Sequence, residues 1–100
     1  MIVVLTTYPK NAQTIAKKII KEKLARCINI IKIESSHYEW KGKLCEGKEF
    51  LLVIKTANKN YKKLEKFIKK NHPYEMPEII KLNVSGGLPA YLRWIESSLA

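Results

Sequence analysis

At 100 residues and 11.6 kDa, the chain has room for a single hydrophobic core, so we expect residues 1–100 to form one domain. A composition of 46% hydrophobic and 28% charged residues is typical of globular proteins and excludes an intrinsically disordered chain. The net charge of +10 raises nucleic acid or an anionic membrane as a partner, but the lysines are spread over two predicted helices whose outer faces must be polar, which makes nucleic acid unlikely.

The first two elements are a strand and a helix. Ile2 to Leu5 is a continuous apolar run that predicts a buried strand, and Pro9 ends it. Asn11 is a candidate cap for a helix that reaches Leu24. Its apolar residues follow the i, i+3, i+4, i+7 spacing of a core-facing stripe.

Residues 27–56 predict a long antiparallel hairpin. Lys41 and Gly42 supply the turn, which places Cys45 opposite a residue near Tyr38 and separates it from Cys27 by too great a distance for a disulfide. The apolar positions before the turn change parity twice, which predicts a bulge or bend.

The second half of the chain predicts a helix, a strand and a short terminal helix. Asn58 or Asn60 can cap the helix, and Pro73 stops it. Ile80, Leu82 and Val84 alternate with polar residues, which predicts a half-buried strand at a sheet edge. Gly86 and Gly87 then separate this strand from the terminal helix.

The order of these elements, βαββαβ with a tail helix, predicts an α+β, ferredoxin-like sandwich with two helices on one face of an antiparallel sheet. In that topology the isoleucine-rich strand that begins at Cys27 lies at an edge. An edge of this length invites aggregation unless it is covered, so we expect it to pair with another subunit.

The catalytic and binding motifs common on this fold do not appear in the sequence. The first strand has no aromatic residue on which RNA bases could stack, and no CxxC follows it. A cysteine on a buried strand is more often an inert hydrophobe than a nucleophile. The segment 72–78 stands out because it holds an imidazole, a phenol and two carboxylates beside two prolines. It is either a rigid lead-in to the last strand or part of a functional site.

Five blocks of the sequence, in order, resemble the CutA divalent-cation-tolerance family: LARCINI at 24–30, SHYEWKGK at 36–43, IKT at 54–56, HPYEMPEI at 72–79 and YLRWI at 91–95. The resemblance implies a homotrimer of ferredoxin-like subunits similar to PII signalling proteins, with hairpins that pair between subunits. It also implies a role in the response to metal ions rather than catalysis. No apolar run is long enough to span a bilayer or to form a signal-peptide core, so we expect a cytoplasmic protein without membrane contact.

The same resemblance implies a pocket, at a cleft between subunits, formed by Cys27, Tyr38, Trp40, Lys55 and Tyr74, with His72 and Glu75 as metal ligands. Thr6 and Asn71 stand where members with proposed copper sites have a cysteine and a second histidine. We therefore expect only weak binding of Cu(II) or another divalent cation.

Two alternatives from other classes stay open. The first is an enzyme or sensor that acts on a small anion in the intersubunit cleft, with Lys55 as an electrostatic clamp and Glu75 or His72 as the acid–base group. The second is a nonspecific nucleic-acid binder driven by charge.

Overall fold

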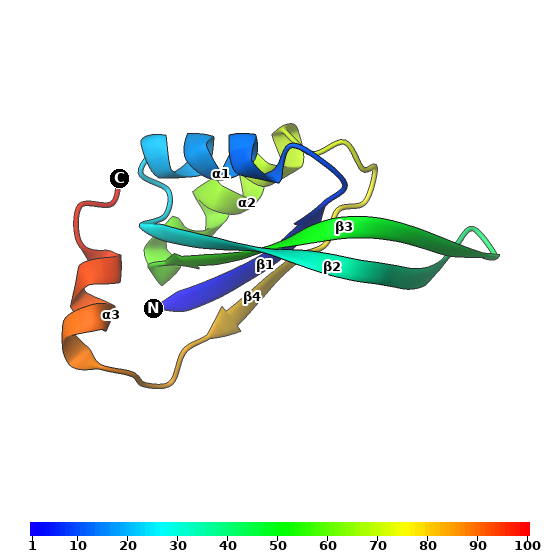
Figure 1. Ribbon diagram of the computed structural model, residues 1–100. Coiled ribbons are helices and arrows are strands. Elements are labelled where there is room, and N and C mark those ends of the chain that lie inside the picture. The colour runs from blue at the N-terminus through cyan, green and yellow to red at the C-terminus, as the bar shows by residue number, and fades with distance from the viewer.

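Four antiparallel strands form one sheet in the order β2-β3-β1-β4, and two helices cover one of its faces (Figure 1). The computed structural model describes residues 1–100. Its elements are β1 (Ile2–Tyr8), α1 (Ala12–Lys21), β2 (Cys27–Trp40), β3 (Lys43–Thr56), a 3-10 turn η1 (Asn58–Asn60), α2 (Tyr61–Lys70), β4 (Ile79–Asn83) and α3 (Pro89–Glu96). This arrangement confirms the predicted ferredoxin-like α+β sandwich, and it places β2 and β4 at the two edges of the sheet.

The core lies between the sheet and the two helices. Alternate residues of a strand point to opposite faces, so only every second side chain of β1 and β3 reaches the helices. These side chains and the apolar stripes of α1 and α2 are fully or almost fully buried: Ile2, Val4, Leu52, Ile54, Ile15, Ile19, Leu64 and Ile68. We call this the covered face of the sheet.

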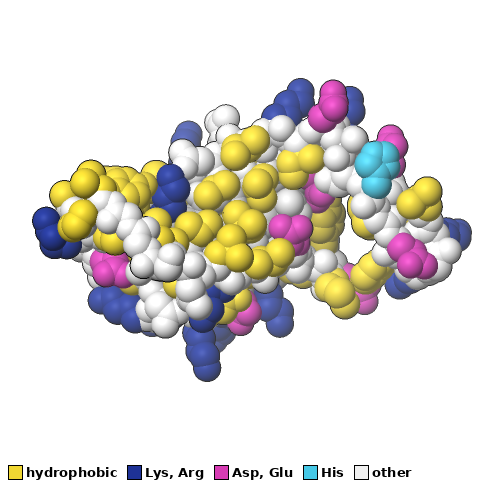
Figure 2. Space-filling view, turned by 90° about the horizontal axis from the view of Figure 1, so that it is seen from below, with side chains coloured by type: hydrophobic (Ala, Val, Ile, Leu, Met, Phe, Trp, Pro, Cys, Tyr) yellow, Lys and Arg dark blue, Asp and Glu magenta, His cyan; other side chains and the backbone are white.

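The opposite side, which we call the open face, carries the other half of the same strands and has no helix over its centre. Figure 2 looks onto this face and shows hydrophobic side chains gathered across the sheet. From the strand registers, the apolar residues on it are Val3, Leu5, Ile31, Leu51, Val53, Ile80 and Leu82. The sheet is therefore apolar on both sides but covered on one.

The β2–β3 hairpin has the predicted register. Tyr38 lies opposite Cys45, and Cys27 lies opposite Lys55, so the two free cysteines are at different places along the hairpin. The turn places Lys41 at φ 52° and Gly42 at φ 78°, and glycine adopts such a positive φ without strain. The predicted bulge is also present, as a register shift between Ile33 and Ser36.

The predicted helix caps are wrong in detail. Asn11 precedes α1 in a left-handed conformation and makes no hydrogen bond from its side chain to the helix. Asn60 precedes α2, but its side-chain amide donates to the Ala100 carbonyl at 2.8 Å instead of capping the helix. The sequence shows that an asparagine stands at each helix start, but not that a distant chain end would compete for one of them.

β4 lies at a sheet edge as predicted, but its apolar residues are placed differently. Ile79 packs against the core, whereas Ile80 and Leu82 lie on the open face and remain 44% and 46% exposed. Val84 falls just beyond the strand, which ends at Asn83. The alternation identified one apolar side of the strand, but not which face of the sheet the helices cover.

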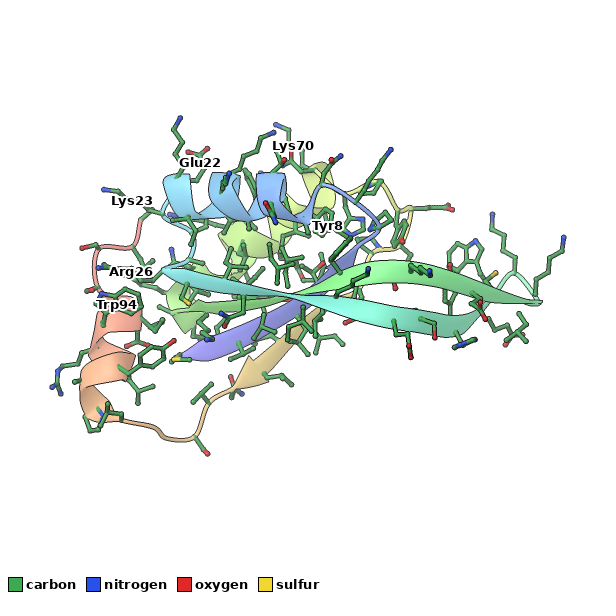
Figure 3. All side chains as sticks on the ribbon, viewed as in Figure 1. Tyr8, Glu22, Lys23, Arg26, Lys70 and Trp94 are labelled. Atoms are coloured by element: carbon green, nitrogen blue, oxygen red, sulfur yellow. The ribbon has the colours of Figure 1, made fainter.

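The C-terminal segment is held against the body of the domain. The Arg26 guanidinium lies 4.6 Å from the Trp94 ring centroid and donates to both the carbonyl and the hydroxyl of Ser97 at 3.1 Å (Figure 3). The terminal amine of Met1 pairs with Glu96 at 2.8 Å. These contacts fix α3 beside one end of the sheet and leave the hairpin end free.

Candidate functional site

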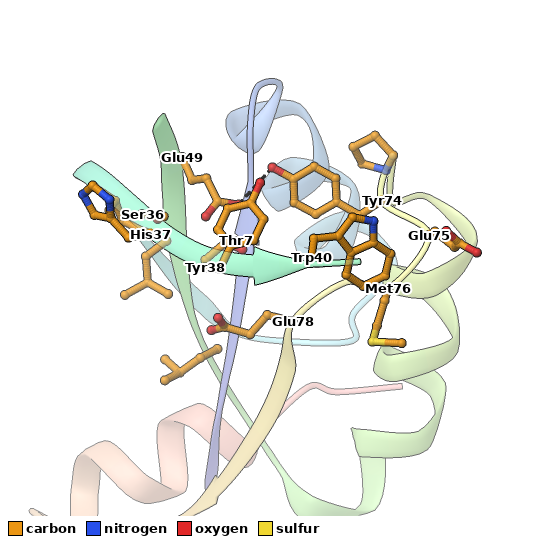
Figure 4. Close-up of a pocket in the computed structure, with 14 residues that line it drawn as sticks. Thr7, Ser36, His37, Tyr38, Trp40, Glu49, Tyr74, Glu75, Met76 and Glu78 are labelled. Carbon is orange, nitrogen blue, oxygen red and sulfur yellow. Dashed lines mark hydrogen bonds between the residues drawn. The ribbon is translucent and has the colours of Figure 1, made fainter. Parts of the chain in front are cut away.

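A cavity of about 770 Å³ opens where the outer half of the hairpin extends past the sheet (Figure 4). We call it the hairpin pocket. It is lined by residues of 33–40 in β2, by Glu49 and Leu51 of β3, by Leu5 and Thr7 of β1, and by the loop 73–78. All of these walls belong to a single chain, and the floor is continuous with the open face.

The pocket exists because the hairpin is longer than its neighbour. β1 pairs with β3 only as far as Tyr8, opposite Phe50, so the hairpin beyond Glu49 has no third strand beside it. The bulge between Ile33 and Ser36 reorients the side chains that follow it. The loop 73–78, which begins with a proline, occupies the space beside them and closes the other wall.

Two carboxylates and a phenol line the pocket. The Tyr74 hydroxyl donates to Glu49 at 3.0 Å. Burial, this hydrogen bond and the charge of Glu49 together raise the pKa of Tyr74 to about 12. Burial and the nearby charge of Glu49 also raise the pKa of the Glu78 carboxyl above its usual range. The interior is thus electronegative and partly shielded from water.

His72 lies behind Tyr74, and both of its ring nitrogens have partners. The backbone N–H of Tyr74 donates to Nδ1 at 3.0 Å, so Nε2 must carry the proton that it donates to the Thr7 carbonyl at 2.7 Å. The ring also packs between Tyr8 and Tyr74, with centroid distances of 4.2 and 4.9 Å. In this arrangement His72 holds the loop 73–78 against the end of β1.

The residues predicted for the site separate into two groups within the subunit. Tyr38, Trp40, Tyr74 and Glu75 line the hairpin pocket, and His72 lies next to it. Cys27 and Lys55 are instead paired at the opposite end of the hairpin. There the Lys55 ammonium donates to Asn29 at 2.6 Å and lies 5.9 Å from the ring centroid of Tyr91.

Two acidic contributors are absent from the predicted pocket residues, although Glu78 belongs to the segment 72–78 that stood out in the sequence. Glu49 faces the pocket from β3, and Glu78 closes it from the end of the loop. The hairpin register could have placed Glu49, because it lies opposite Ile33. Its contact with Tyr74, 25 residues away in sequence, depends on how the loop folds back, and no local pattern shows that.

The donor set does not form a preassembled metal centre. No group of three or more His, Cys, Asp or Glu side chains is placed to hold an ion. Both nitrogens of His72 are engaged, and the Glu75 carboxylate points away from Glu49 and Tyr38 (Figure 4). A metal at His72 would first have to displace one of two hydrogen bonds.

Fold and site together define a ferredoxin-like protein with an extended hairpin, an open apolar sheet face and a pocket beside the hairpin. The family described as "CutA1 divalent ion tolerance protein" matches residues 2–98. The chain therefore belongs to the CutA family.

Relatives from several kingdoms agree with this assignment. The divalent-cation tolerance protein CutA of Thermus thermophilus is 41% identical over 98 residues, covering 96% of this chain and 95% of the relative. Human protein CutA is 42% identical over 86 residues, 86% of this chain, and the match spans only 48% of its length. Several eukaryotic relatives are thus about twice as long as the matched region.

Solved structures also agree. CutA1 from Thermus thermophilus superimposes with a TM-score of 0.94 at 40% identity, covering all of both chains. A PII-like CutA from Nostoc superimposes with a TM-score of 0.95 at 28% identity, covering 100% of this chain and 98% of the other. Other relatives carry the words chloroplastic or periplasmic in their names. None of the helices of this chain is long and apolar enough to cross a membrane.

Proposed function

We propose that this chain is a homotrimeric, cytoplasmic divalent-cation tolerance protein that acts as a binding or signalling module in the response to metal ions, and not as an enzyme. The observation that carries the proposal is the uncovered apolar face of the sheet, with β2 exposed along its edge (Figure 2). The names of the relatives and the PII-like neighbour support the role.

The open face supplies the driving force for assembly. Ile31 on the edge strand is 51% exposed, and Ile80 and Leu82 are nearly as exposed on the other edge. Completing the burial of each such side chain contributes on the order of 1 kcal/mol. The edge strands also present unpaired backbone groups, which strands of a neighbouring subunit can satisfy. A closed trimer covers both features in all three copies.

Copper, or another divalent cation, enters this proposal only as a weakly bound ligand. His72 and Glu75 are the proposed ligands, and binding has to release either the Tyr74 N–H or the Thr7 carbonyl from the imidazole. That cost and the small number of available donors favour low affinity.

The small-anion alternative receives no support from the geometry of one subunit. The hairpin pocket is lined by Glu49, Glu75 and Glu78 and by no lysine or arginine. Lys55, the proposed clamp, lies at the other end of the hairpin beside Asn29. A negatively charged ligand would therefore meet carboxylates of the same sign.

Two matched substitutions test the proposal. Ile31→Lys puts a charge on the open face at the β2 edge, and we expect it to shift the mass measured by light scattering from trimer toward monomer at micromolar concentration. Ile20→Lys makes the same change on α1, at a position that is 38% exposed and outside the open face, and it should leave the mass unchanged. If both variants keep the wild-type mass, the open face is not the interface.

A further inference from the structure

The two helices that cover the sheet carry almost all of the net charge of the chain. Residues 10–25 and 57–71, which form α1, α2 and their flanks, contain eleven lysines and two glutamates, so they account for +9 of the total of +10. The rest of the chain holds eight basic residues and seven glutamates and is nearly neutral. The sequence argument against nucleic acid treated these lysines as spread over two helices, but the fold lays both helices on one side of the sheet (Figure 1).

The lysines of both helices lie on the surface that points away from the sheet, which we call the helix face. Since the apolar stripes of α1 and α2 point to the core, the remaining positions are exposed, and they include Lys17, Lys18 and Lys21 of α1 and Lys62, Lys63, Lys66, Lys69 and Lys70 of α2. An open hollow of about 500 Å³ between the helices brings Lys18, Lys21 and Lys70 together, with Glu22 as the one acidic group that lines it (Figure 3).

The charges of the helix face are not neutralised within the chain. The two ion pairs of the structure contain no lysine. The lysines that have a hydrogen-bond or cation–π partner belong to the hairpin and β4: Lys41, Lys55 and Lys81. Glu65 of α2 accepts a hydrogen bond from the Tyr61 hydroxyl at 2.9 Å and pairs with no lysine. The helix face therefore keeps its full positive charge for a partner.

The stability of the helices does not explain this accumulation of lysines. A lysine in the last turn of a helix is favourable, because it lies at the negative end of the helix dipole. Lys62 and Lys63, however, lie in the first turn of α2, which contains no acidic residue to offset them. Lys62, Lys66 and Lys70 also follow one another at i, i+4, a spacing at which like charges repel. A bound polyanion would remove both costs.

The side chains of the helix face favour contacts with phosphates over recognition of bases. The face has no arginine, the residue that most often reads guanine, and Tyr61 and Phe67 pack against the core instead of standing out to stack on bases. Lysine binds phosphate as a compact point charge. A helix of ten residues is about 15 Å long, and a nucleic-acid duplex of that length carries about nine phosphate charges, close to the +9 of the helical segments.

An anionic membrane fits this surface less well than nucleic acid. Helices that bind at a membrane surface bury apolar side chains beside their basic residues. Among the large hydrophobic residues that are exposed, only Ile20 belongs to α1 or α2.

We propose that the helix face binds nucleic acid through its phosphate backbone, without reading the base sequence. The helix face and the open face lie on opposite sides of the sheet, so a trimer that covers the open face leaves the helix face accessible. The proposal therefore does not depend on trimer formation.

Fluorescence anisotropy with labelled DNA duplexes tests the proposal. For two duplexes of unrelated sequence, each of about 20 base pairs, we expect the same Kd, on the order of 1–10 μM in about 50 mM KCl. Raising KCl to about 200 mM should weaken binding by about 100-fold or more, as expected when about four phosphates are contacted.

Two matched double substitutions locate the binding surface. Lys66→Gln with Lys70→Gln on α2 should weaken binding by at least about tenfold and reduce the slope of the salt dependence by about 2. Lys43→Gln with Lys48→Gln removes the same charge from exposed positions of the hairpin and should change the Kd by less than about twofold. Because Lys66 and Lys70 repel each other, the α2 variant should melt no lower than the wild type, which separates lost binding from misfolding.

Equal effects of the two double variants would overturn the proposal, because the net charge of the chain would then drive binding. So would the absence of binding at about 100 μM protein, or a clear preference for one duplex sequence. Stronger binding to phosphatidylserine vesicles than to DNA, or displacement of DNA by polyglutamate at equal charge concentration, would also overturn it and would assign the face to a membrane or an acidic protein. Light scattering without DNA reports the trimer separately, so either idea can fail alone.

Discussion

The two faces of the sheet differ in how deeply their side chains are buried, although the same strand contributes side chains to both. On β1, Ile2 and Val4 point to the helices and are completely or almost completely buried, whereas Val3 and Leu5 point to the open face and stay partly exposed. The helices of the same subunit cover the first face and leave the second exposed. We therefore expect the covered face to determine the stability of the subunit, and we propose that the open face determines assembly.

The comparison also holds for polar groups. On the covered face the Thr56 hydroxyl donates to the Leu24 carbonyl at 2.7 Å, but the Tyr8 hydroxyl is buried without a partner. On the open side the Tyr74 hydroxyl has Glu49 as its acceptor and the space of the hairpin pocket beside it. On the covered face an unpaired hydroxyl is thus buried within the core, whereas on the open side the polar groups lie around a cavity.

The largest effect on stability should come from substituting two neighbouring leucines of β3 whose side chains point to opposite faces of the sheet. Leu52→Ala deletes a side chain with no exposed area, so we expect it to lower the free energy of unfolding by about 2–5 kcal/mol at any protein concentration. Leu51→Ala acts on the open face, so its cost should be largest where the protein is fully associated and should shrink on dilution, as the wild type dissociates too. Urea titrations of both variants and the wild type at two protein concentrations measure these costs. If the costs of Leu51→Ala and Leu52→Ala depend on protein concentration in the same way, the proposed difference between the two faces is wrong.

A smaller effect, visible only in alkali, concerns Tyr8 on the covered face. Burial raises the pKa of Tyr8 to about 12, whereas an unfolded tyrosine titrates near 10. The folded state thus keeps this proton longer, so the contribution of neutral Tyr8 is complete below about pH 10 and is lost as the pH rises toward 12. Tyr8→Phe removes the unpartnered hydroxyl without changing the ring.

Melting temperatures between pH 8 and 11 compare the two proteins. The wild type should lose stability more steeply than Tyr8→Phe above about pH 10, and the difference between the two should stay constant between pH 8 and 9. Parallel curves over the whole range would show that the Tyr8 hydroxyl is not held in the dry interior described here.

The sequence predicted what local patterns control. The turn at Lys41 and Gly42 placed Cys45 opposite a residue near Tyr38, and the parity change predicted a bulge, which the structure has between Ile33 and Ser36. Both results follow from the two-residue period of a strand, which leaves little freedom once the turn is known.

The sequence could not supply what depends on contacts between distant segments. Glu49 and Tyr74 meet only because the loop 73–78 folds against the outer hairpin, and Asn60 is diverted from its helix by the chain end. Lys55 shares a strand with Glu49, yet the length of that strand keeps it away from the pocket. Only the fold therefore shows that the candidate site residues lie in two separate groups.

The mass of the wild-type protein in solution, followed by sedimentation or light scattering on dilution through the micromolar range, tests the central claim most directly. If the open face is an interface, the mass stays three times that of the 11.6 kDa chain, and dissociation begins only at far lower concentration. A stable monomer at micromolar concentration would contradict the account, because the apolar open face would then be exposed to water in the working protein.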